Sequence, residues 1–482
     1  MRSKKICFII ILLVVCSLLY LSNHYIKSEN GALYFSYHNN ARKLIKIPSI
    51  VVHSTKNRSE KCAKIFASWK ISIQRNNKWQ KLEQYSLFLY SAYKDNRLPN
   101  NYYIRILAMS KGKLEKRIFC MFWFQDYKTS VIEAEVDELW VAYWDYANPR
   151  EYYRPLLISC AVNEHSTPIA VSVITKPCVE PTNVFWFNST HSDTNQTRDF
   201  AICLKPLNFQ NDISSRLLEW LELQFLLGAS NITIYMYHLN QRTFEMLRIY
   251  ESSGRIAIIN HTLPENNSKN LSESESSLDK AIWQKRRHEM LIYNDCFYRH
   301  IQSHKFVINL DLDEAIIPLK HNSWKELLEF IKNKHPKVFH SASISVRNVY
   351  FFEKFGDESN SSLPKYFHML RHLRRSVNFT PPGFAQKSFF QTQHAMSVSN
   401  HYALKSLYPG MRTSTLISED VAQMHHYRAS CPPKMEKECK ENYMKFQKRD
   451  PAILRFKDKL IKSVIKRIKE LNFTIVSGDA IL

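Results

Sequence analysis

The sequence of 482 residues predicts an α/β fold: a mostly parallel sheet flanked by helices, preceded by an all-β accessory domain and an N-terminal membrane anchor. Three observations predict it. From Phe200 onward, strand-like apolar runs alternate with amphipathic helical ones, which is the pattern of βα units. Before Phe200 the runs are short and rich in β-branched and aromatic residues, as in antiparallel sheets. At the start of the chain, a basic flank precedes an apolar stretch.

The N-terminal stretch predicts an uncleaved membrane anchor. The first five residues, Met1-Arg2-Ser3-Lys4-Lys5, form a basic flank, and the run from Ile6 to Leu21 is apolar except for Ser17. Bulky residues follow where a cleavage site would need small ones. A helix of this length spans about 24 Å, which suits the thinner membranes of the early secretory route. Because the basic end should stay cytoplasmic, we expect a single-pass type II protein of the Golgi membrane with a lumenal body.

Cysteines and glycan acceptors agree with a lumenal body. The cysteines beyond the anchor are even in number and lack the CxxC spacing of zinc sites, so disulfides are expected, although the spacing does not fix the pairs. They are Cys62, Cys120, Cys160, Cys178, Cys203, Cys296, Cys431 and Cys439. Asn-x-Ser/Thr acceptors of N-linked glycans also recur along the chain, which predicts a glycoprotein.

Charge and glycine content narrow the range of partners. The net charge is +23, but the basic residues are spread along the chain without a helix-turn-helix, zinc-finger or RNA-binding signature. We therefore expect no nucleic acid as a partner; anionic small molecules and membrane surfaces fit equally well. The chain has eight glycines and neither a GxGxxG nor a GxxxxGK[ST] loop. A bound nucleotide would thus need a metal ion to hold its phosphates.

Shifts in composition divide the chain into segments. The last segment carries apolar residues at helical spacing from Ile453 to Leu471, with lysines between them. This predicts an amphipathic helix docked on the preceding domain, with membrane-surface binding as the alternative. The expected segments are a cytoplasmic tail at 1–5, an anchor at 6–26, a stem at 27–85, a β-rich accessory domain at 86–199, a catalytic α/β domain at 200–430 and a C-terminal helical extension at 431–482.

One strand predicts the chemistry. The apolar run that begins at Phe306 ends abruptly in Asp311, Asp313 and Glu314. Alternate residues of an extended chain share a face, so Asp311 and Asp313 are expected to point the same way. Two converging carboxylates repel unless a cation lies between them, and their oxygens suit Mg²⁺ or Mn²⁺. The alternative is an acidic turn without a metal, because Asp-x-Asp alone is weakly specific.

The sequence resembles glycosyltransferase family 92 between Phe200 and Arg428. The resemblance rests on Trp220-Leu221-Glu222 with Phe225-Leu226-Leu227-Gly228-Ala229, on Gln284 followed by Asn294-Asp295-Cys296-Phe297-Tyr298-Arg299, on Asp311-Leu312-Asp313-Glu314, and on His426-Tyr427-Arg428. It implies a GT-A fold, a UDP-sugar donor and Mn²⁺ dependence. It also implies β-galactosyl transfer from UDP-galactose, with inversion, onto a glycan; nematode-type members resembling this chain act on fucose of N-glycan cores.

The resemblance also assigns expected roles. Asp311 and Asp313 match the family's acidic pair and are expected to face the metal and the diphosphate, whereas the role of Glu314 stays open between metal, donor and backbone. A late histidine would complete the metal shell, and His401 and His426 compete for this place. His401 is preferred because it follows an apparent strand, while the cluster that contains His426 could equally hold phosphate.

Asp295 and the catalytic base complete the candidate site. Asp295 lies on the helix before the acidic strand, where it could bind ribose or uracil or, alternatively, cap or pair within the helix. Inversion requires a base that deprotonates the acceptor hydroxyl, normally Asp or Glu. The sequence does not identify this base, and its weak candidates are Glu353, Asp357, Glu358, Glu419 and Asp420.

The leading hypothesis is a metal-dependent lumenal hexosyltransferase that uses a nucleotide sugar and a glycan or glycoprotein acceptor. The alternative is a non-catalytic, membrane-anchored glycan-binding or scaffolding protein with the same fold. A third possibility, a metal-dependent phosphodiesterase, suits the carboxylates but predicts release of a nucleoside monophosphate instead of UDP.

Overall fold

The structure is a computed structural model of the chain. It describes residues 79–99, 101–125, 128–145, 152–162, 167–187, 198–264, 281–358, 363–432 and 435–470. The predicted tail, the predicted anchor and most of the predicted stem lie outside these residues. Within the described part of the chain, no helix is both long enough and apolar enough to cross a membrane.

The described residues before Arg198 form two antiparallel sheets. A five-stranded sheet has the order β1-β2-β3-β7-β6, with β1 Gln80–Leu82, β2 Leu87–Leu98, β3 Asn101–Lys111, β7 Tyr153–Val162 and β6 Glu135–Glu138. A four-stranded sheet has the order β5-β4-β8-β9, with β5 Thr129–Glu133, β4 Phe119–Trp123, β8 Ala170–Ile174 and β9 Phe185–Trp186. A disulfide between Cys120 and Cys160 joins β4 to β7 and so links the two sheets. The strand β1 begins inside the range predicted as stem.

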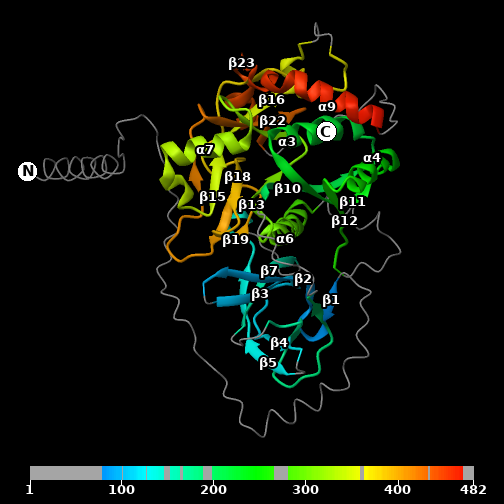
Figure 1. Cartoon of the computed structure of the whole chain (residues 1–482), viewed down its shortest axis with the longest axis vertical. Coiled ribbons are helices and arrows are strands. Elements are labelled where there is room, and N and C mark those ends of the chain that lie inside the picture. The colour runs from blue at the N-terminus through cyan, green and yellow to red at the C-terminus, as the bar shows by residue number, and fades with distance from the viewer. Residues whose placement is uncertain are drawn as a thin grey trace, which may run out of the picture. The chain divides into compact units, whose positions relative to one another are not determined.

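A seven-stranded sheet forms the centre of the α/β region (Figure 1). Its order is β12-β11-β10-β13-β18-β15-β21, with β12 Ile256–Asn260, β11 Ala229–Leu239, β10 Arg198–Phe209, β13 His304–Leu310, β18 Lys387–Gln391, β15 Ser343–Val346 and β21 Thr415–Leu416. The first four of these strands are parallel, as the βα alternation predicts, whereas β18 runs antiparallel to both β13 and β15. The described chain is therefore a mixed α/β fold.

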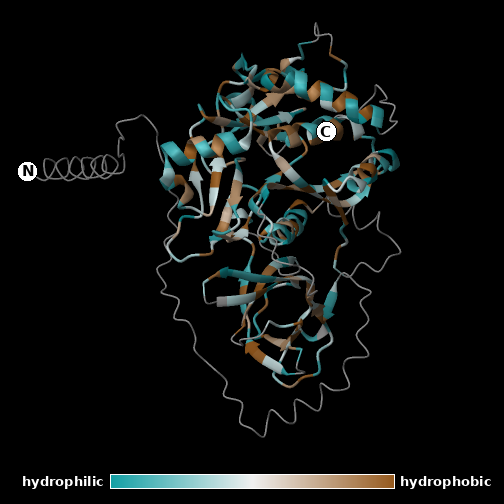
Figure 2. Cartoon of the chain, in the orientation of Figure 1, coloured by the Kyte–Doolittle hydropathy of each residue, from teal (hydrophilic) through white to brown (hydrophobic). Residues whose placement is uncertain are grey.

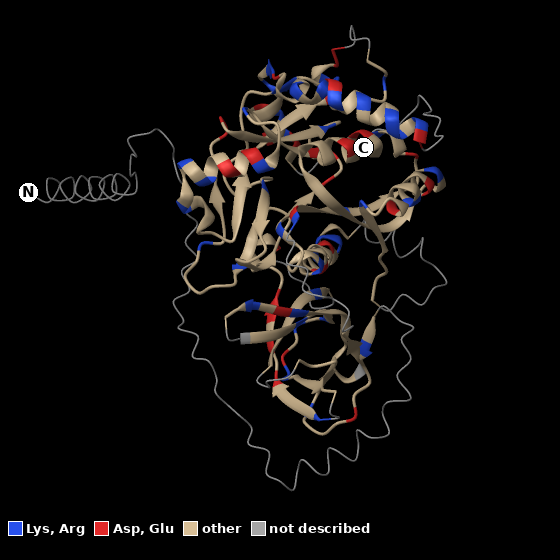
Figure 3. Cartoon of the chain, viewed as in Figure 1, with Lys and Arg blue, Asp and Glu red and all other residues tan. Residues whose placement is uncertain are grey.

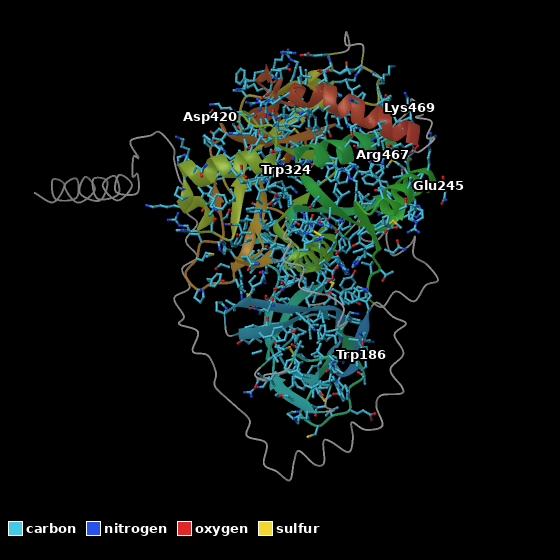
Figure 4. All side chains as sticks on the ribbon, in the orientation of Figure 1. Trp186, Glu245, Trp324, Asp420, Arg467 and Lys469 are labelled. Carbon is cyan, nitrogen blue, oxygen red and sulfur yellow. A yellow bond between two sulfur atoms is a disulfide. The ribbon has the colours of Figure 1, made fainter. Side chains whose placement is uncertain are left out.

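Helices cover both faces of the central sheet, which explains why its strands are apolar on both sides. They are α3 Ser214–Leu227, α4 Gln241–Ser252, α6 Ile282–His300 and α7 Trp324–Lys334. On β10, Ile202 and Leu204 pack with residues of α3 and α7, whereas Ala201 and Cys203 pack with residues of α6. The side chain of Trp324, labelled in Figure 4, is fully buried. A disulfide between Cys203 and Cys296 ties β10 to α6.

Helix α3 ends at a glycine. Gly228 closes it with φ +125°, and its backbone N–H donates to the carbonyls of Gln224 and Phe225 at 3.2 Å. An L side chain is strained at this φ, so glycine is the residue that suits the position. The adjoining strand β11 can therefore begin directly at Ala229.

Smaller sheets complete the C-terminal half. A three-stranded sheet has the order β14-β22-β16, with β14 Glu314–Pro318, β22 Ala422–Arg428 and β16 Asn348–Phe352. Two strand pairs are β17 Arg374–Ser376 with β23 Gln447–Arg449, and β19 Ala395–Val398 with β20 Ala403–Ser406. The short helix α8, Glu436–Cys439, ends at the disulfide between Cys431 and Cys439 that the sequence allows.

The C-terminal helix α9, Lys457–Glu470, is amphipathic and docks on the α/β region, as its apolar spacing predicts. Figure 2 shows its hydrophobic and hydrophilic residues alternating, and Figure 3 shows that basic residues dominate its charges. Leu460 and Val464 are buried in the same core as α3. Arg467 reaches Glu222 of α3 at 3.4 Å, whereas Lys469 is exposed (Figure 4).

Candidate active site

The acidic residues lie where the chain passes from one sheet to another. Asp311 and Asp313 form the turn between β13 and β14, and Glu314 is the first residue of β14. The backbone N–H of Asp311 donates to Oε2 of Glu314 at 2.8 Å, and the N–H of Glu314 donates to the carbonyl of Asp311 at 3.2 Å. Trp220 of α3 donates its indole N–H to the carbonyl of Glu314 at 2.8 Å. Because the backbone turns here, the alternation of an extended strand does not set the directions of the two aspartates.

Asp311 lies between two lysines. Nζ of Lys205, from β10, is 3.2 Å from Oδ2 of Asp311, and Nζ of Lys387, from β18, is 3.0 Å from its Oδ1. Burial alone would raise the pKa of Asp311, but Lys205 and then Lys387 hold it well below its usual range. Both oxygens of this carboxylate therefore already face an ammonium group.

Asp313 faces His426 instead. Oδ2 of Asp313 is 3.2 Å from Nε2 of His426, and Oε1 of Glu314 is 3.6 Å from Nδ1 of the same ring. The antiparallel pairing of β14 with β22 places Glu314 directly opposite His426. Ligand atoms of Asp313, Glu314 and His426 all lie within 4.8 Å of one another, and no other group of three or more His, Cys, Asp or Glu residues in the described part of the chain does so.

The electrostatics of these two acids differ. Burial would raise the pKa of Asp313, but His426 lowers it below its ordinary value. Burial and the charge of Asp311 raise the pKa of Glu314. Each of two neighbouring carboxylates disfavours the ionised form of the other, so a cation that binds between them stabilises both ionised forms.

The donor set fits a divalent ion such as Mn²⁺ or Mg²⁺. Two carboxylates and one imidazole are ligands that such ions accept. Nδ1 of His426 lies 3.2 Å from the side-chain oxygen of the buried Asn348, so a proton on Nδ1 would leave the lone pair of the ring on Nε2, the nitrogen that lies beside Asp313. A hydrogen-bond acceptor on the other ring nitrogen is typical of a metal-binding histidine. Arg428 also approaches Nε2 of His426, at 3.4 Å.

The structure does not bring His401 into this group. Its Nδ1 lies 2.8 Å from the carbonyl of Gln386, and burial together with Lys387 lowers the pKa of His401 to about 3. Of the two competing histidines, His426 is the one that lies beside an acid of the motif, although the sequence favoured the other.

Asp295 lies in a different environment. Its carboxylate is fully buried and accepts hydrogen bonds from Ser91 and Tyr93 of β2, from Tyr235 of β11 and from Arg299 of α6, at 2.5 to 2.8 Å. These donors occupy both oxygens of Asp295 and connect the β-rich region to the α/β region. They match the predicted alternative of a pairing role and give no support to the predicted contact with ribose or uracil.

Most of the candidate bases are engaged in ion pairs. Glu353 lies 3.0 Å from Nε2 of His368 and 2.8 Å from Arg216, and these two contacts lower the pKa of Glu353 to about 2, which makes it a poor proton acceptor. Asp420 is exposed and lies at the periphery in Figure 4. The remaining pairs are Asp357 with Arg371, Glu358 with Arg449, and Glu419 with Arg347.

Three residues of the site escaped the sequence reasoning: Lys205, Lys387 and Asn348. Lys387 had a signal, because it begins the otherwise uncharged run Lys387-Ser388-Phe389-Phe390, which predicts a strand with a charge at its buried end. Lys205 directly follows Leu204, which pairs with Leu310 of β13. Asn348 had no signal, since its position depends on the parallel pairing of β16 with β22.

Comparison with known proteins defines the class of this protein. The model of the family described as glycosyltransferase family 92 matches residues 198–468, which is more than half of the chain. The chain therefore belongs to glycosyltransferase family 92, as the sequence motifs predict. The matched region extends through most of α9.

One curated relative and two solved structures are also similar to this chain, at low sequence identity. A glycosyltransferase family 92 protein of Caenorhabditis elegans is 23% identical over 265 residues, which cover 53% of this chain and 48% of that protein. The match thus spans about half the length of this curated relative. Among solved structures, TarS 1-349 of S. aureus in complex with UDP has 11% identity and a TM-score of 0.25, covering 58% of this chain and 67% of that one. TarS of S. aureus has 13% identity and a TM-score of 0.24, covering 56% and 43%. These TM-scores are too low to support an argument.

Proposed function

We propose that this member of glycosyltransferase family 92 transfers a hexose from a UDP-sugar to a glycan acceptor with the help of a divalent metal ion. Galactose as the sugar, inversion at its anomeric carbon and fucose on an N-glycan core as the acceptor are what the family resemblance implies. The observation that carries the proposal is the convergence of Asp313, Glu314 and His426 at the carboxyl end of a parallel strand. Ligands of open α/β sheets gather at such strand ends.

The proposed ion would be held by Asp313 and His426, with Glu314 as the third ligand. When bound, a divalent ion neutralises negative charge on a diphosphate and on the departing nucleotide. The predicted ligand Asp311 remains part of the site, but its contacts with Lys205 and Lys387 compete with a metal for its oxygens.

Two cationic side chains beside the acids suit a diphosphate. Arg428 lies next to His426, and Lys205, whose side chain is about one-third exposed, lies next to Asp311. We expect both to bind phosphate oxygens, since guanidinium and ammonium groups are the usual partners of phosphate. The acceptor hydroxyl must lose a proton to a carboxylate, and the identity of this base stays a prediction.

We place the reaction in the Golgi lumen, with the chain anchored by its N-terminal apolar stretch as a type II membrane protein. The disulfides Cys120–Cys160, Cys203–Cys296 and Cys431–Cys439 support an oxidising compartment. The proposed compartment can be checked by localising a tagged chain and by testing its glycans for sensitivity to endoglycosidases.

A donor screen tests the proposal. The purified lumenal part of the chain is incubated with Mn²⁺, a panel of UDP-sugars and fucosylated N-glycans, and release of UDP is measured for the wild type and for Asp313→Ala. We expect release of UDP with one donor, loss of release in EDTA, and a fall of at least about 1,000-fold in the variant.

Other outcomes point to the alternatives. Glycan binding without turnover on any donor would support the non-catalytic binding protein. Release of UMP instead of UDP would support a phosphodiesterase. Turnover that is unaffected by EDTA and by Asp313→Ala would show that the acidic group is not the metal site of this enzyme.

A further inference from the structure

A buried ammonium group lies behind the acidic motif. Lys387 is the first residue of β18, and its side chain is 0% exposed. Its Nζ lies 3.0 Å from Oδ1 of Asp311, 2.7 Å from Oε2 of Glu314 and 2.6 Å from the side-chain oxygen of Asn400. An ammonium group has three donors, so these contacts satisfy all of them.

Such a group is costly to bury unless it is paired. A lysine without counter-charges would lose its proton in this environment, but the two carboxylates raise the pKa of Lys387 against the effect of burial. The charge in turn allows Asp311 and Glu314 to lie side by side, although each carboxylate would repel the other. The ammonium group of Lys387 thus offsets the repulsion between these two carboxylates, as a bound metal cation would.

The contacts divide the acidic motif into two sides. On one side, Asp311 and Oε2 of Glu314 face Lys387, which is inaccessible and cannot exchange. On the other side, Asp313 and Oε1 of Glu314 face His426. The side chain of Asp313 is 24% exposed, so an ion from solvent can reach this second side.

We propose that Lys387 is a positioning residue that serves as a fixed internal cation of the site. It holds Asp311 and Glu314 in place, and its charge confines the exchangeable divalent ion to Asp313, His426 and the facing oxygen of Glu314. The part of this inference that concerns the divalent ion rests on the proposed function. The part that concerns the coupling of Lys387 with Asp311 does not.

Charge-balanced variants test the inference. Lys387→Met makes the site one unit more negative, Asp311→Asn makes it one unit less negative, and the double variant restores the charge of the wild type. Mn²⁺ binding is followed by the electron paramagnetic resonance signal of the free ion. We expect Lys387→Met to bind Mn²⁺ at least about tenfold more tightly, Asp311→Asn at least about tenfold more weakly, and the double variant within about threefold of the wild type, because like charges repel. A merely structural role for Lys387 predicts weaker binding in Lys387→Met instead.

Thermal unfolding in EDTA provides a second readout that needs no metal. Lys387→Met should unfold at a clearly lower temperature than the wild type, and the double variant should recover at least about half of that loss. Even if Lys387→Met is too unstable to purify, the double variant should still fold and bind Mn²⁺. Lys205→Met is the matched control: it faces the same carboxylate from a side that is 35% exposed, so its effects should be several-fold smaller.

The results separate the two proposals. A wild type that binds no Mn²⁺ would contradict the metal site of the proposed function, while the recovery of stability in the double variant would still uphold the coupling. Equal losses of stability and of Mn²⁺ binding in Lys387→Met and in the double variant would overturn the inference about Lys387.

Discussion

Two carboxylates, that of Asp295 on α6 and that of Asp313 in the turn after β13, differ in the partners of their oxygens. Asp295 is 0% exposed, and Ser91, Tyr93, Tyr235 and Arg299 donate to it. Asp313 is 24% exposed, and the partner of its carboxylate is a histidine ring. Both carboxylates have a pKa below the usual range, so the charge state does not distinguish them.

The comparison shows what makes a carboxylate available to a ligand. Asp295 receives two donors at each oxygen, and an added ligand would have to displace a hydrogen bond that is already satisfied. Within the described residues, the carboxylate of Asp313 has His426 as its partner, and it lies next to a second acid, Glu314. Sequence motifs contain both aspartates, but the number of donors around each oxygen separates the structural acid from the candidate ligand.

The largest effect that bears on this comparison is expected at His426. In His426→Ala the ion loses its imidazole ligand, and we expect the affinity for Mn²⁺ to fall by about 100-fold. His401→Ala is the matched control, since Nδ1 of His401 lies against the carbonyl of Gln386 and this histidine is not in the group formed by Asp313, Glu314 and His426; the affinity of this variant should stay within about threefold of the wild type. Isothermal titration of both variants with Mn²⁺ measures the difference. Equal losses in the two variants would show that His401 belongs to the metal site.

The next effect concerns stability at Asp295. In Asp295→Asn, Arg299 loses its counter-charge and the buried hydroxyls lose an acceptor, so the free energy of unfolding should fall by about 3 kcal/mol. Tyr93→Phe removes one donor and should cost about 1 kcal/mol. Both are measured by urea unfolding, and the activity per folded molecule should stay within about threefold of the wild type. A loss of donor affinity in Asp295→Asn without a loss of stability would instead support the predicted nucleotide contact.

Glu219 of α3 is a third buried acid, and its hydrogen-bond donors are backbone N–H groups. Its carboxylate is 1% exposed and accepts from the N–H groups of His368, Met369 and Leu370 at 2.7 to 3.2 Å. Burial outweighs these hydrogen bonds and raises the pKa of Glu219 to about 7. Because the folded chain then binds a proton that the unfolded chain releases at lower pH, this contribution to stability is present at acidic pH and is lost as the pH rises through about 7.

The pH dependence gives a direct test. Relative to Glu219→Gln, which cannot ionise, the wild type should lose about 2 kcal/mol in free energy of unfolding between about pH 5 and about pH 8. Urea unfolding at several pH values measures this difference. A difference that does not change with pH would show that the three N–H groups keep Glu219 ionised throughout.

The smallest effect is expected at Asp420, which is exposed and, unlike Asp357 and Glu419, forms no ion pair within the described residues. Asp420→Asn should change the turnover by less than about twofold. It should change the free energy of unfolding by less than about 0.5 kcal/mol. Kinetics with the donor identified by the screen provide the measurement. A fall of about 100-fold or more in turnover with unchanged stability would instead identify Asp420 as the catalytic base.

Much of the fold could be predicted because its signals are local. The periodicity from Ala201 to Glu314 contains β10, α3, β11, α4, β12, α6 and β13 in the right order, and Gly228 marks the end of α3. The strands β1 and β2 escaped prediction, since Gln80–Leu82 is short and polar and Leu87–Leu98 is interrupted by the charged residues Lys94, Asp95 and Arg97. Asp95, for example, is buried with Arg97 and Arg105, and no local pattern shows that pairing.

The site was predicted less completely because strand pairing decides it. The motif that contains Asp311 and Asp313 and the late His426 were both visible in the sequence. The pairing register of β14 with β22 places Glu314 opposite His426, and this register decides which histidine lies beside the acidic motif. The paired residues are more than 100 positions apart in the sequence. The contact of Lys387 with the acids depends in the same way on β18 running antiparallel beside β13. Such pairings carry no signal within one stretch of sequence.

The disulfide between Cys203 and Cys296 has a practical consequence for anyone producing this protein. It links β10, which carries Lys205, to α6, which carries Asp295 and Arg299, so the cross-link lies between the strand that reaches the acids and the helix that joins the two regions. Synthesis in a bacterial cytoplasm, where thiols stay reduced, should therefore yield chains that aggregate or lose activity early. Periplasmic or eukaryotic secretion is the route by which we expect the experiments above to succeed.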